Sequence, residues 1–239
     1  MPYRTFNLNE VAIYLHLART DLETLVQHRE IPVETQGNRL VFRKKDIDTW
    51  ASQHILGLSD KRLTTYHKQT SALTRDRSHQ SLSVVALVRP EAIEPELTSK
   101  TKSSVLRDMV ALADRIGSVC NPSDFLQSLV ERERLCSTAL SDGIALLHPR
   151  NHDPYMVVNS FISIGRAIHP VPFGAPDGNR TDLFFLIGCQ DDRLHLHVLA
   201  RLCMISKQTK VLLQLREAES ANAMIAILRR AEENIVGQM

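Results

Sequence analysis

Residues 132–150 read RERLCSTALSDGIALLHPR, and this stretch decides the fold. It joins a charged segment, which begins at Arg132, to an apolar run, GIALL, that opens on Gly143 and ends directly before His148. A short apolar run bounded by turn residues is typical of a buried β-strand. The sequence therefore predicts a histidine at the end of a buried strand and an arginine at the end of the preceding helix.

Strands and helices alternate through the rest of this region. Asn121 before Pro122 is a strong helix start, because asparagine accepts a hydrogen bond from a free amide and proline fits the first helical turn. We expect strands at 83–88, 143–147, 155–164 and 181–188, and helices at about 103–116, 121–134, 192–205 and 220–235. This alternation predicts an α/β fold in which helices flank a mixed sheet.

Helical periodicity orients three polar side chains. His195 continues the apolar face formed by Val198, Leu199 and Leu202, whereas His197 points the other way and is expected to be exposed. Arg132 falls on the inward face of its helix. An arginine on an inward face needs an anionic partner.

Three segments together resemble the enzyme IIA domain of the mannitol/fructose, or nitrogen-regulatory, class of the bacterial sugar phosphotransferase system. Residues 132–150 resemble its phosphorylation-site motif, R-E-R followed by G-[IV]-A-[IV]-P-H, and HLHVLARL at 195–202 resembles its H-L-x-x-L-A-x-L helix. FGAPDGNRTDLFFLIG at 173–188 matches the run before that helix. The resemblance covers about residues 84–236.

This resemblance implies that His148 accepts a phosphoryl group and that Arg132 and His195 assist. The chemistry suits them, because neutral imidazole is a nucleophile near pH 7, and a guanidinium and a second imidazole spread phosphate charge. Two positions differ from the family pattern: Leu147 replaces proline, which leaves the backbone before the histidine freer, and Asp142 often aligns with asparagine. We expect the Asp142 carboxylate to repel an incoming phosphate.

The first 50 residues predict two short helices and a hairpin. Asn7 with Glu10 three residues later marks a helix start, and the helix continues to about Leu15. A second helix is expected from Ala18 to His28. Alternating apolar and polar residues on either side of Gln36-Gly37-Asn38 predict a hairpin.

This segment resembles the excisionase/MerR-like winged helix-turn-helix family. In that family the second helix enters the major groove of DNA and the wing contacts the backbone. The resemblance therefore nominates seven DNA-binding residues: Arg19, Thr20, Thr24, Gln27, Arg39, Arg43 and Lys44. The alternative is a fold that serves protein contact or homodimer formation.

Length and composition set the remaining bounds. The 239 residues suit two domains, and we divide them into a winged helix-turn-helix at 1–56, a polar linker at 57–82 and an enzyme IIA domain at 83–239. A net charge of +2 is too small to argue for nucleic acid across the whole chain. No apolar run predicts a membrane segment or signal peptide, which favours a cytoplasmic protein. Four widely spaced cysteines predict reduced, mostly buried thiols, and we expect no metal or other cofactor.

Three functions fit these patterns. The first is a regulator in which phosphorylation of His148 by the histidine-containing phosphocarrier protein alters DNA or partner binding. The second is a phosphocarrier that passes phosphate to a sugar-specific IIB domain. The third is a pseudo-phosphotransferase, a binding module that keeps the fold and senses another ligand or protein.

Overall fold

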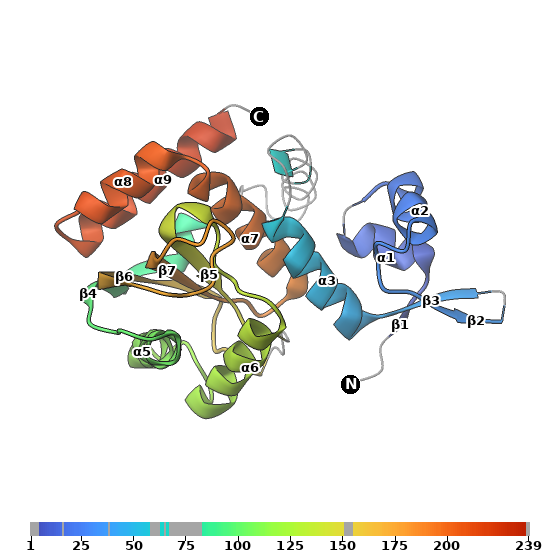
Figure 1. The fold of residues 1–239 in the computed structure, drawn as a ribbon, viewed down its shortest axis with the longest axis horizontal. Coiled ribbons are helices and arrows are strands. Elements are labelled where there is room, and N and C mark those ends of the chain that lie inside the picture. Colours follow the sequence, from blue (N-terminus) through green and yellow to red (C-terminus); the bar gives the residue numbers. More distant parts are fainter. Residues whose placement is uncertain are drawn as a thin grey trace.

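The computed structural model describes residues 5–15, 17–37, 39–57, 63–64, 66, 83–150 and 155–237. Figure 1 shows two parts, which we call the N-terminal unit (residues 5–57) and the C-terminal unit (residues 83–237). Helix α3 lies between them. No helix within the described ranges is long and apolar enough to cross a membrane.

A four-stranded mixed sheet forms the centre of the C-terminal unit. Its strands are β4 (Val88–Leu97), β5 (Ile144–Leu147), β6 (Phe161–Val171) and β7 (Thr181–Gly188). Their spatial order is β4-β6-β7-β5. The outer pairs, β4 with β6 and β5 with β7, are parallel, and the central pair, β6 with β7, is antiparallel. The predicted mixed sheet is therefore confirmed, and the strand that leads to His148 lies at its edge.

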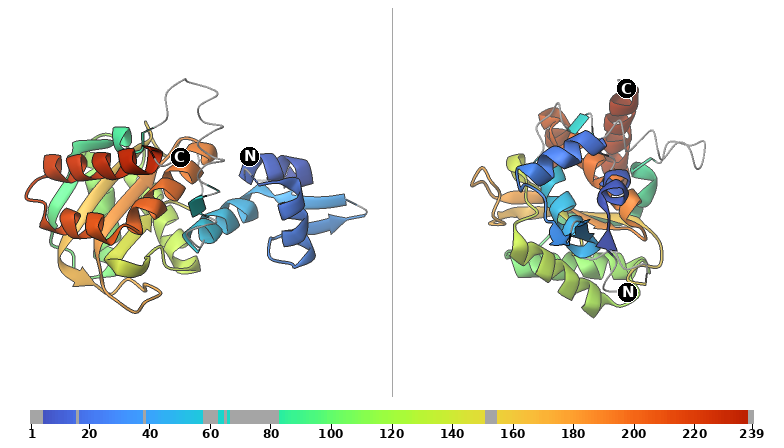
Figure 2. Two further views of the ribbon diagram at one scale, coloured as in Figure 1. Left: turned by 90° about the horizontal axis from the view of Figure 1, so that it is seen from above. Right: turned by 90° about the vertical axis from the view of Figure 1, so that its right-hand side faces the viewer.

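Helices cover both faces of this sheet. Helices α5 and α6 lie on one face and helices α7, α8 and α9 on the other (Figures 1 and 2). Their bounds are Lys102–Arg115, Pro122–Leu135, Asp192–Ser206, Thr209–Glu217 and Ala221–Gly237. Asn121 caps α6 by accepting from the amides of Ser123 and Asp124, as the Asn-Pro pair predicted. Helix α8 is an addition to the elements expected from the sequence.

Burial on both faces explains why the strand before His148 is apolar throughout. Ile144 and Leu146 belong to the core shared with α7 to α9, whereas Ala145 and Leu147 belong to the core shared with α5 and α6. Successive side chains of a strand point to opposite faces, so both faces of this strand meet apolar neighbours. The edge strand is therefore held firmly on both sides.

Two of the expected strands begin later than predicted. Residues Val85–Leu87 form a short 3-10 turn before β4, because the Glu232 carboxylate accepts from the Val84 and Val85 amides over 2.7 and 3.2 Å. Strand β6 begins only at Phe161. The segment before it bonds instead to the turn before α6, where the Val158 amide donates to the Ser118 carbonyl over 3.0 Å.

The N-terminal unit contains the two expected helices and the hairpin. Its elements in chain order are β1 (Thr5–Phe6), α1 (Leu8–Leu15), α2 (Arg19–Gln27), β2 (Glu34–Gln36), β3 (Arg39–Arg43) and α3 (Lys44–Leu56). The strands lie in the order β1-β3-β2. The capping pair is present, since the Asn7 amide donates to Glu10 over 2.7 Å and the Glu10 amide donates to Asn7 over 3.0 Å. Ala18 before α2 makes no side-chain cap.

Helix α3 joins the two units. It packs along α7 (Figure 1), and one continuous apolar cluster runs from the N-terminal unit into the face of the sheet covered by α7 to α9. Leu63 and Tyr66, from the segment predicted as a polar linker, are buried in the same cluster. At these two residues the core covers the side chains, whereas the polar composition of the segment predicted a solvated connector.

Candidate functional site

His148 lies directly after β5 and is 1% exposed. Its Nδ1 atom is 2.8 Å from the carbonyl oxygen of Leu146. A carbonyl oxygen only accepts hydrogen bonds, so Nδ1 carries the proton and Nε2 keeps its lone pair. The backbone of the same strand thus selects the tautomer of the ring.

Arg132 reaches His148 from the last turn of α6. Its Nε–H donates to Nε2 of His148 over 2.9 Å, and its Nη1 donates to the carbonyl oxygen of Cys136 over 3.0 Å. The arginine is 1% exposed. Its Nη2 is buried and has no hydrogen-bond partner among the residues that the structure describes. A buried guanidinium with an unused donor beside an imidazole is suited to bind an anion there.

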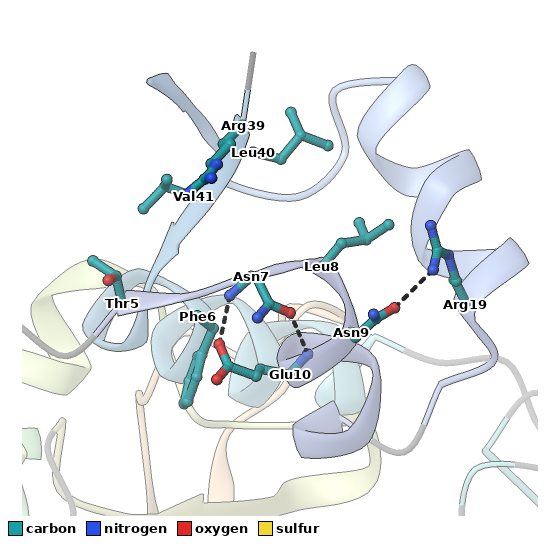
Figure 3. Close-up of a pocket in the computed structure, with 10 residues that line it drawn as sticks. All are labelled: Thr5, Phe6, Asn7, Leu8, Asn9, Glu10, Arg19, Arg39, Leu40 and Val41. Carbon is teal, nitrogen blue, oxygen red and sulfur yellow. Dashed lines mark hydrogen bonds between the residues drawn. The ribbon is translucent and has the colours of Figure 1, made fainter. Parts of the chain in front are cut away.

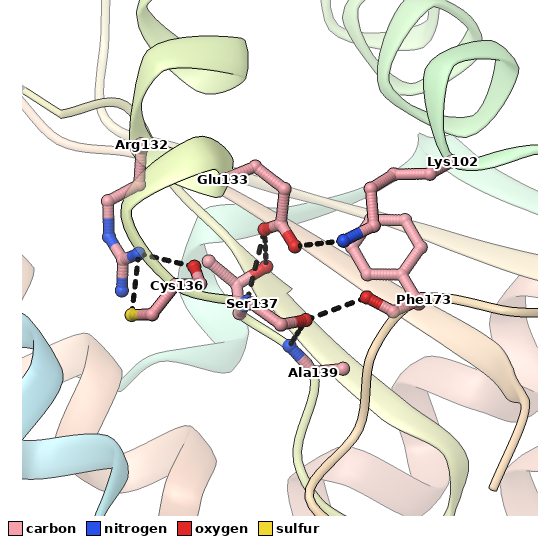
Figure 4. A network of polar contacts seen from close by, with 8 residues as sticks. Lys102, Arg132, Glu133, Cys136, Ser137, Ala139 and Phe173 are labelled. Carbon is pink, nitrogen blue, oxygen red and sulfur yellow. Dashed lines mark hydrogen bonds and ion pairs between the residues drawn. The ribbon is translucent and has the colours of Figure 1, made fainter. Parts of the chain in front are cut away.

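The neighbouring Glu133 supports this arginine through the turn that follows α6 (Figure 4). Its carboxylate accepts from the Thr138 amide over 3.0 Å, from the Thr138 hydroxyl over 2.7 Å and from the Lys102 ammonium over 2.8 Å. These contacts fold the chain back so that the Cys136 carbonyl faces the Arg132 guanidinium. Glu133 is not among the residues nominated from the sequence, although it lies within the R-E-R motif.

His195 completes the group from the first turn of α7. Its ring centroid lies 5.1 Å from that of His148, with an angle of 48° between the ring planes. The side chain is 1% exposed, and Asp191 caps the helix by accepting from the Leu194 amide over 2.9 Å. The structure therefore brings together the three residues nominated from the sequence, Arg132, His148 and His195. We call these three residues the His148 site.

Two expectations about neighbouring residues are wrong. His197 is 2% exposed rather than exposed, because α7 is covered by α3 and α9 as well as by the sheet. Asp142 lies before β5 and His148 after it, so the whole strand separates the two side chains. The Asp142 carbonyl accepts from Arg216, and its amide donates to Asp177. Its carboxylate is therefore not a neighbour of the His148 ring.

Gly143 shows why this turn takes a small residue. Its φ angle is +77°, and a Cβ there would meet Nη2 of Arg216 at 2.6 Å and Oδ1 of Asp182 at 2.9 Å. Arg216 and Asp182 form an ion pair over 2.7 Å. Glycine permits both the positive φ and the close approach of this pair.

The cysteines divide into two kinds. Cys189 and Cys203 are buried, which raises the pKa of both thiols, that of Cys203 to about 12. Cys120 and Cys136 are exposed, so the expectation of mostly buried thiols holds for half of them. Within the described segments, histidine, cysteine and acidic side chains do not gather in groups of three that could hold a metal ion. His152, a histidine close to the motif to which the sequence gives no functional role, lies outside the described residues.

The nominated residues of the N-terminal unit lie mostly on its surface. Six of them are exposed: Arg19, Thr20, Thr24, Gln27, Arg39 and Arg43. The arginines of α2 and β3 are partly compensated, since Arg19 pairs with Glu23 and Arg43 pairs with Glu34, each over 2.8 Å. Between residues 5 and 57 there are six lysines and arginines against seven acidic residues. Attraction to a polyanion would therefore have to be local.

A pocket of about 470 Å³ lies between the start of α1, the start of α2 and the hairpin (Figure 3). Arg39 lines it from β3, and Arg19, bonded to Asn9 over 3.0 Å, lines it from α2. Lys44 does not belong to this surface. Its ammonium contacts Asp48 over 2.8 Å and Asp192 of the C-terminal unit over 2.6 Å, so it lies in ion pairs between the units and apart from the six exposed residues.

The fold and this arrangement define an α/β domain built around a buried arginine–histidine pair. Residues 86–231 match the family described as "Phosphoenolpyruvate-dependent sugar phosphotransferase system, EIIA 2". The chain belongs to this family. The matched residues lie within the C-terminal unit.

Relatives and solved structures agree with this membership. The chain is 29% identical over 151 residues to the nitrogen regulatory protein of Bradyrhizobium diazoefficiens, which covers 62% of this chain and 95% of the relative. It is 28% identical over 154 residues to the fructose-specific EIIABC component of Bacillus subtilis, covering 64% of this chain but only 24% of that relative. The nitrogen regulatory protein IIA-Ntr of Neisseria meningitidis has a TM-score of 0.56 and 27% identity, covering 61% of this chain and 98% of that one.

Proposed function

We propose that this protein is a phosphorylation-linked regulator in which His148 accepts a phosphoryl group from the histidine-containing phosphocarrier protein. The observation that carries the proposal is the buried Arg132, which bonds Nε2 of His148 and keeps a second donor, Nη2, unused within the described part of the chain. The donor set fits a phosphoryl group attached at Nε2. Similarity to nitrogen regulatory proteins supports a regulatory role.

The tautomer of His148 determines which of its nitrogens accepts the phosphoryl group. The Nε2 lone pair of His148 attacks the phosphorus of the phosphocarrier's phosphohistidine, and an N–P bond forms at Nε2. The donor's P–N bond breaks, and its electron pair returns to the donor ring. The Arg132 guanidinium, which donates to Nε2 before transfer, then donates to the phosphoryl oxygens. The His195 ring lies next to His148 and can donate to the same oxygens. The Leu146 carbonyl holds the Nδ1 proton throughout.

Burial adds a requirement to this mechanism. At 1% exposure, Nε2 of His148 cannot meet a donor protein unless a neighbouring group moves first. Burial also strengthens the interaction between the new phosphate and the guanidinium, because the local dielectric is lower than that of water. We expect an opening step before transfer and a well-stabilised phosphohistidine after it.

The test is phosphate transfer from the purified, labelled phosphocarrier, followed at alkaline pH where phosphohistidine survives. We expect labelling of the wild type and none of His148→Ala. His169→Ala is the matched control, because His169 is an exposed histidine of the same unit. Equal labelling of wild type and His148→Ala would refute the assignment.

A second candidate is a phosphocarrier that delivers phosphate to a IIB domain. It is favoured by the match to one part of a fructose-specific EIIABC component. A chase of the labelled protein with purified IIB domains separates the two functions, because a transport phosphocarrier loses its label rapidly and a regulator keeps it. Absence of any labelling would favour the third reading, a pseudo-phosphotransferase that binds a ligand or protein at the His148 site.

The regulatory output is assigned to the N-terminal unit. We propose that the exposed face of α2 and the hairpin, with Arg39 and Arg19 on either side of the pocket, contact duplex DNA. The near balance of charge in this unit favours protein contact or homodimer formation as the alternative. Whether the N-terminal unit binds DNA or a protein, we propose that phosphorylation at the His148 site regulates this binding.

A further inference from the structure

A part-buried polar cluster connects the two units. It consists of Tyr14 from α1, Lys44 and Asp48 from α3, and Asp192 from α7, and we call it the Lys44 cluster. The Lys44 ammonium contacts Asp48 over 2.8 Å and Asp192 over 2.6 Å, and it lies 5.6 Å from the centre of the Tyr14 ring. The Tyr14 hydroxyl donates to Asp48 over 2.5 Å. Lys44 is thus the cation between two carboxylates, one from each unit.

This cluster is one helical turn from the His148 site. Asp192 is the first residue of α7 and His195 the fourth, so the two side chains lie on neighbouring positions of one helix face. The His195 ring in turn lies 5.1 Å from the His148 ring. A path of three residues, Lys44, Asp192 and His195, therefore leads from the N-terminal unit to the candidate phosphate acceptor.

The charges along this path determine whether Lys44 favours or opposes phosphate on His148. A phosphoryl group adds about −1.5 to −2 charges at pH 7, and an uncovered Asp192 carboxylate would repel it. The Lys44 ammonium neutralises this carboxylate and holds the first turn of α7 against α3. The contact is mostly buried, with side-chain exposures of 26% for Lys44 and 17% for Asp192, so salt screens it less than a surface pair.

We propose that Lys44 of the N-terminal unit is a positioning residue of the His148 site. By covering the Asp192 carboxylate one helical turn from His195, Lys44 favours phosphate on His148. Linkage is reciprocal, so phosphate on His148 strengthens the attachment of α3 to α7 by the same factor. This inference rests on the proposed function. It identifies the Lys44–Asp192 ion pair as the contact through which phosphorylation of His148 affects the N-terminal unit.

The experiment compares phosphorylation rates of the full-length wild type with Lys44→Met, Lys44→Arg and Lys45→Met. Lys45 is the matched control, because it is the next residue of α3 and is exposed. We expect Lys44→Met to slow labelling on the order of tenfold, Lys44→Arg to restore most of the rate, and Lys45→Met to match the wild type. Asp192→Asn combined with Lys44→Met should recover the rate, because the carboxylate that needed covering is gone.

A second measurement needs no phosphate. Histidine-ring NMR should show that Lys44→Met moves the His195 resonances, because the charge on the neighbouring helix position is then no longer covered. Lys45→Met should leave these resonances unchanged. Thermal unfolding checks that Lys44→Met is folded, and the Asp192→Asn double variant tests the inference where Lys44→Met alone is unstable.

The outcomes separate the two proposals. An unlabelled wild type refutes the proposed function, while the NMR comparison still decides whether Lys44 acts on His195. A labelled wild type with equal rates for Lys44→Met and Lys45→Met overturns the inference alone. A loss of rate in Lys44→Met that the added Asp192→Asn change does not recover also overturns it, because Lys44 then acts only by supporting the fold.

Discussion

The Nε–H of Arg132 donates to Nε2 of His148 over 2.9 Å, and these two residues, sixteen positions apart in the sequence, are each 1% exposed. The bond uses one edge of the guanidinium and leaves Nη2 without a partner in the described parts of the chain. A phosphoryl group on Nε2 would meet both donors. On the proposed function, the two donors are therefore in place beside Nε2 before phosphate is bound.

Replacing Arg132 should affect phosphate uptake far more than replacing its exposed neighbour. Arg132→Lys keeps the charge but loses the planar pair of donors, and we expect phosphorylation to slow on the order of a hundredfold. Arg134→Lys, an equally conservative change on the exposed side of the same helix, should leave the rate unchanged. Initial rates of labelling at fixed phosphocarrier concentration make the comparison, and similar rates for both variants would contradict the role of Arg132.

Glu133 should act on stability and on phosphate uptake together. Glu133→Ala leaves the buried Thr138 amide and hydroxyl without their acceptor, which should lower the free energy of unfolding by about 1–3 kcal/mol. The turn that presents the Cys136 carbonyl to Arg132 then loosens, and labelling should slow as well. Urea denaturation measures the first effect, with Glu131→Ala as the control on the same helix. A loss of stability at an unchanged labelling rate would limit Glu133 to a structural role.

The two departures from the family pattern should matter little. The ring of His148 is already held at both nitrogens, by Leu146 and Arg132, so Leu147→Pro should change the labelling rate by no more than about twofold. Asp142→Asn should have no effect, because β5 separates it from the histidine. A rise on the order of tenfold in either variant would mean that the backbone before His148, or a long-range charge, limits transfer.

DNA binding by the N-terminal unit should depend on Arg39 more than on Arg43, because Arg43 is already paired with Glu34. We expect Arg39→Ala to weaken binding across sequences and to reduce the salt dependence by about one phosphate contact. Thr24→Ala should act more selectively among sequences. Fluorescence anisotropy with duplex DNA over a salt series is the measurement. A full-length protein that forms homodimers and does not bind DNA even at low salt would replace this proposal with the protein-contact reading.

The pH dependence of the free energy of unfolding should reveal the raised pKa of Asp48. Burial, and then the charge of Asp192, raise the pKa of this carboxyl above 3.8, although Lys44 opposes both. A carboxyl whose folded-state pKa is raised binds protons more tightly when folded, so the wild type gains stability as pH falls through that value. Relative to Asp48→Asn, the wild type should therefore become more stable between neutral pH and about pH 4, by urea denaturation at each pH. A difference that stays constant with pH, or moves the other way, would contradict a raised pKa.

Much of the C-terminal unit was predictable because the signals are local. The Asn121-Pro122 start of α6 and the apolar strand at 181–188 depend on capping chemistry and on burial of continuous apolar runs. The motif around His148 was identified by its resemblance to the enzyme IIA phosphorylation-site pattern, which is also local in the sequence. Helix α8 was not predicted, although the sequence indicates it: Val211, Leu212 and Leu215 follow helical spacing. All three side chains are buried in the structure.

The errors arise where a distant residue overrides the local pattern. Val84 and Val85 read as a strand but bond to Glu232, 148 residues after Val84, and so turn. His197 reads as an exposed residue of an amphipathic helix, but α7 is covered on several sides. Periodicity describes one apolar face and cannot show how many neighbours a helix will meet.

The sequence by itself determined the fold class of the C-terminal unit and the order of its main elements, because these follow from the local hydrophobic pattern. Its resemblance to the enzyme IIA motifs nominated Arg132, His148 and His195. Only the tertiary structure decided that Nε2 is the unprotonated nitrogen of His148, which accepts from Arg132, since a hydrogen bond from Nδ1 to the Leu146 carbonyl selects the tautomer. It also decided the partners of Lys44. The sequence placed this residue in a DNA-binding wing, whereas the packing of α3 on α7 surrounds its ammonium with two carboxylates. The sequence shows that a side chain is charged. Which groups pair with that charge depends on the elements that the folded chain brings together.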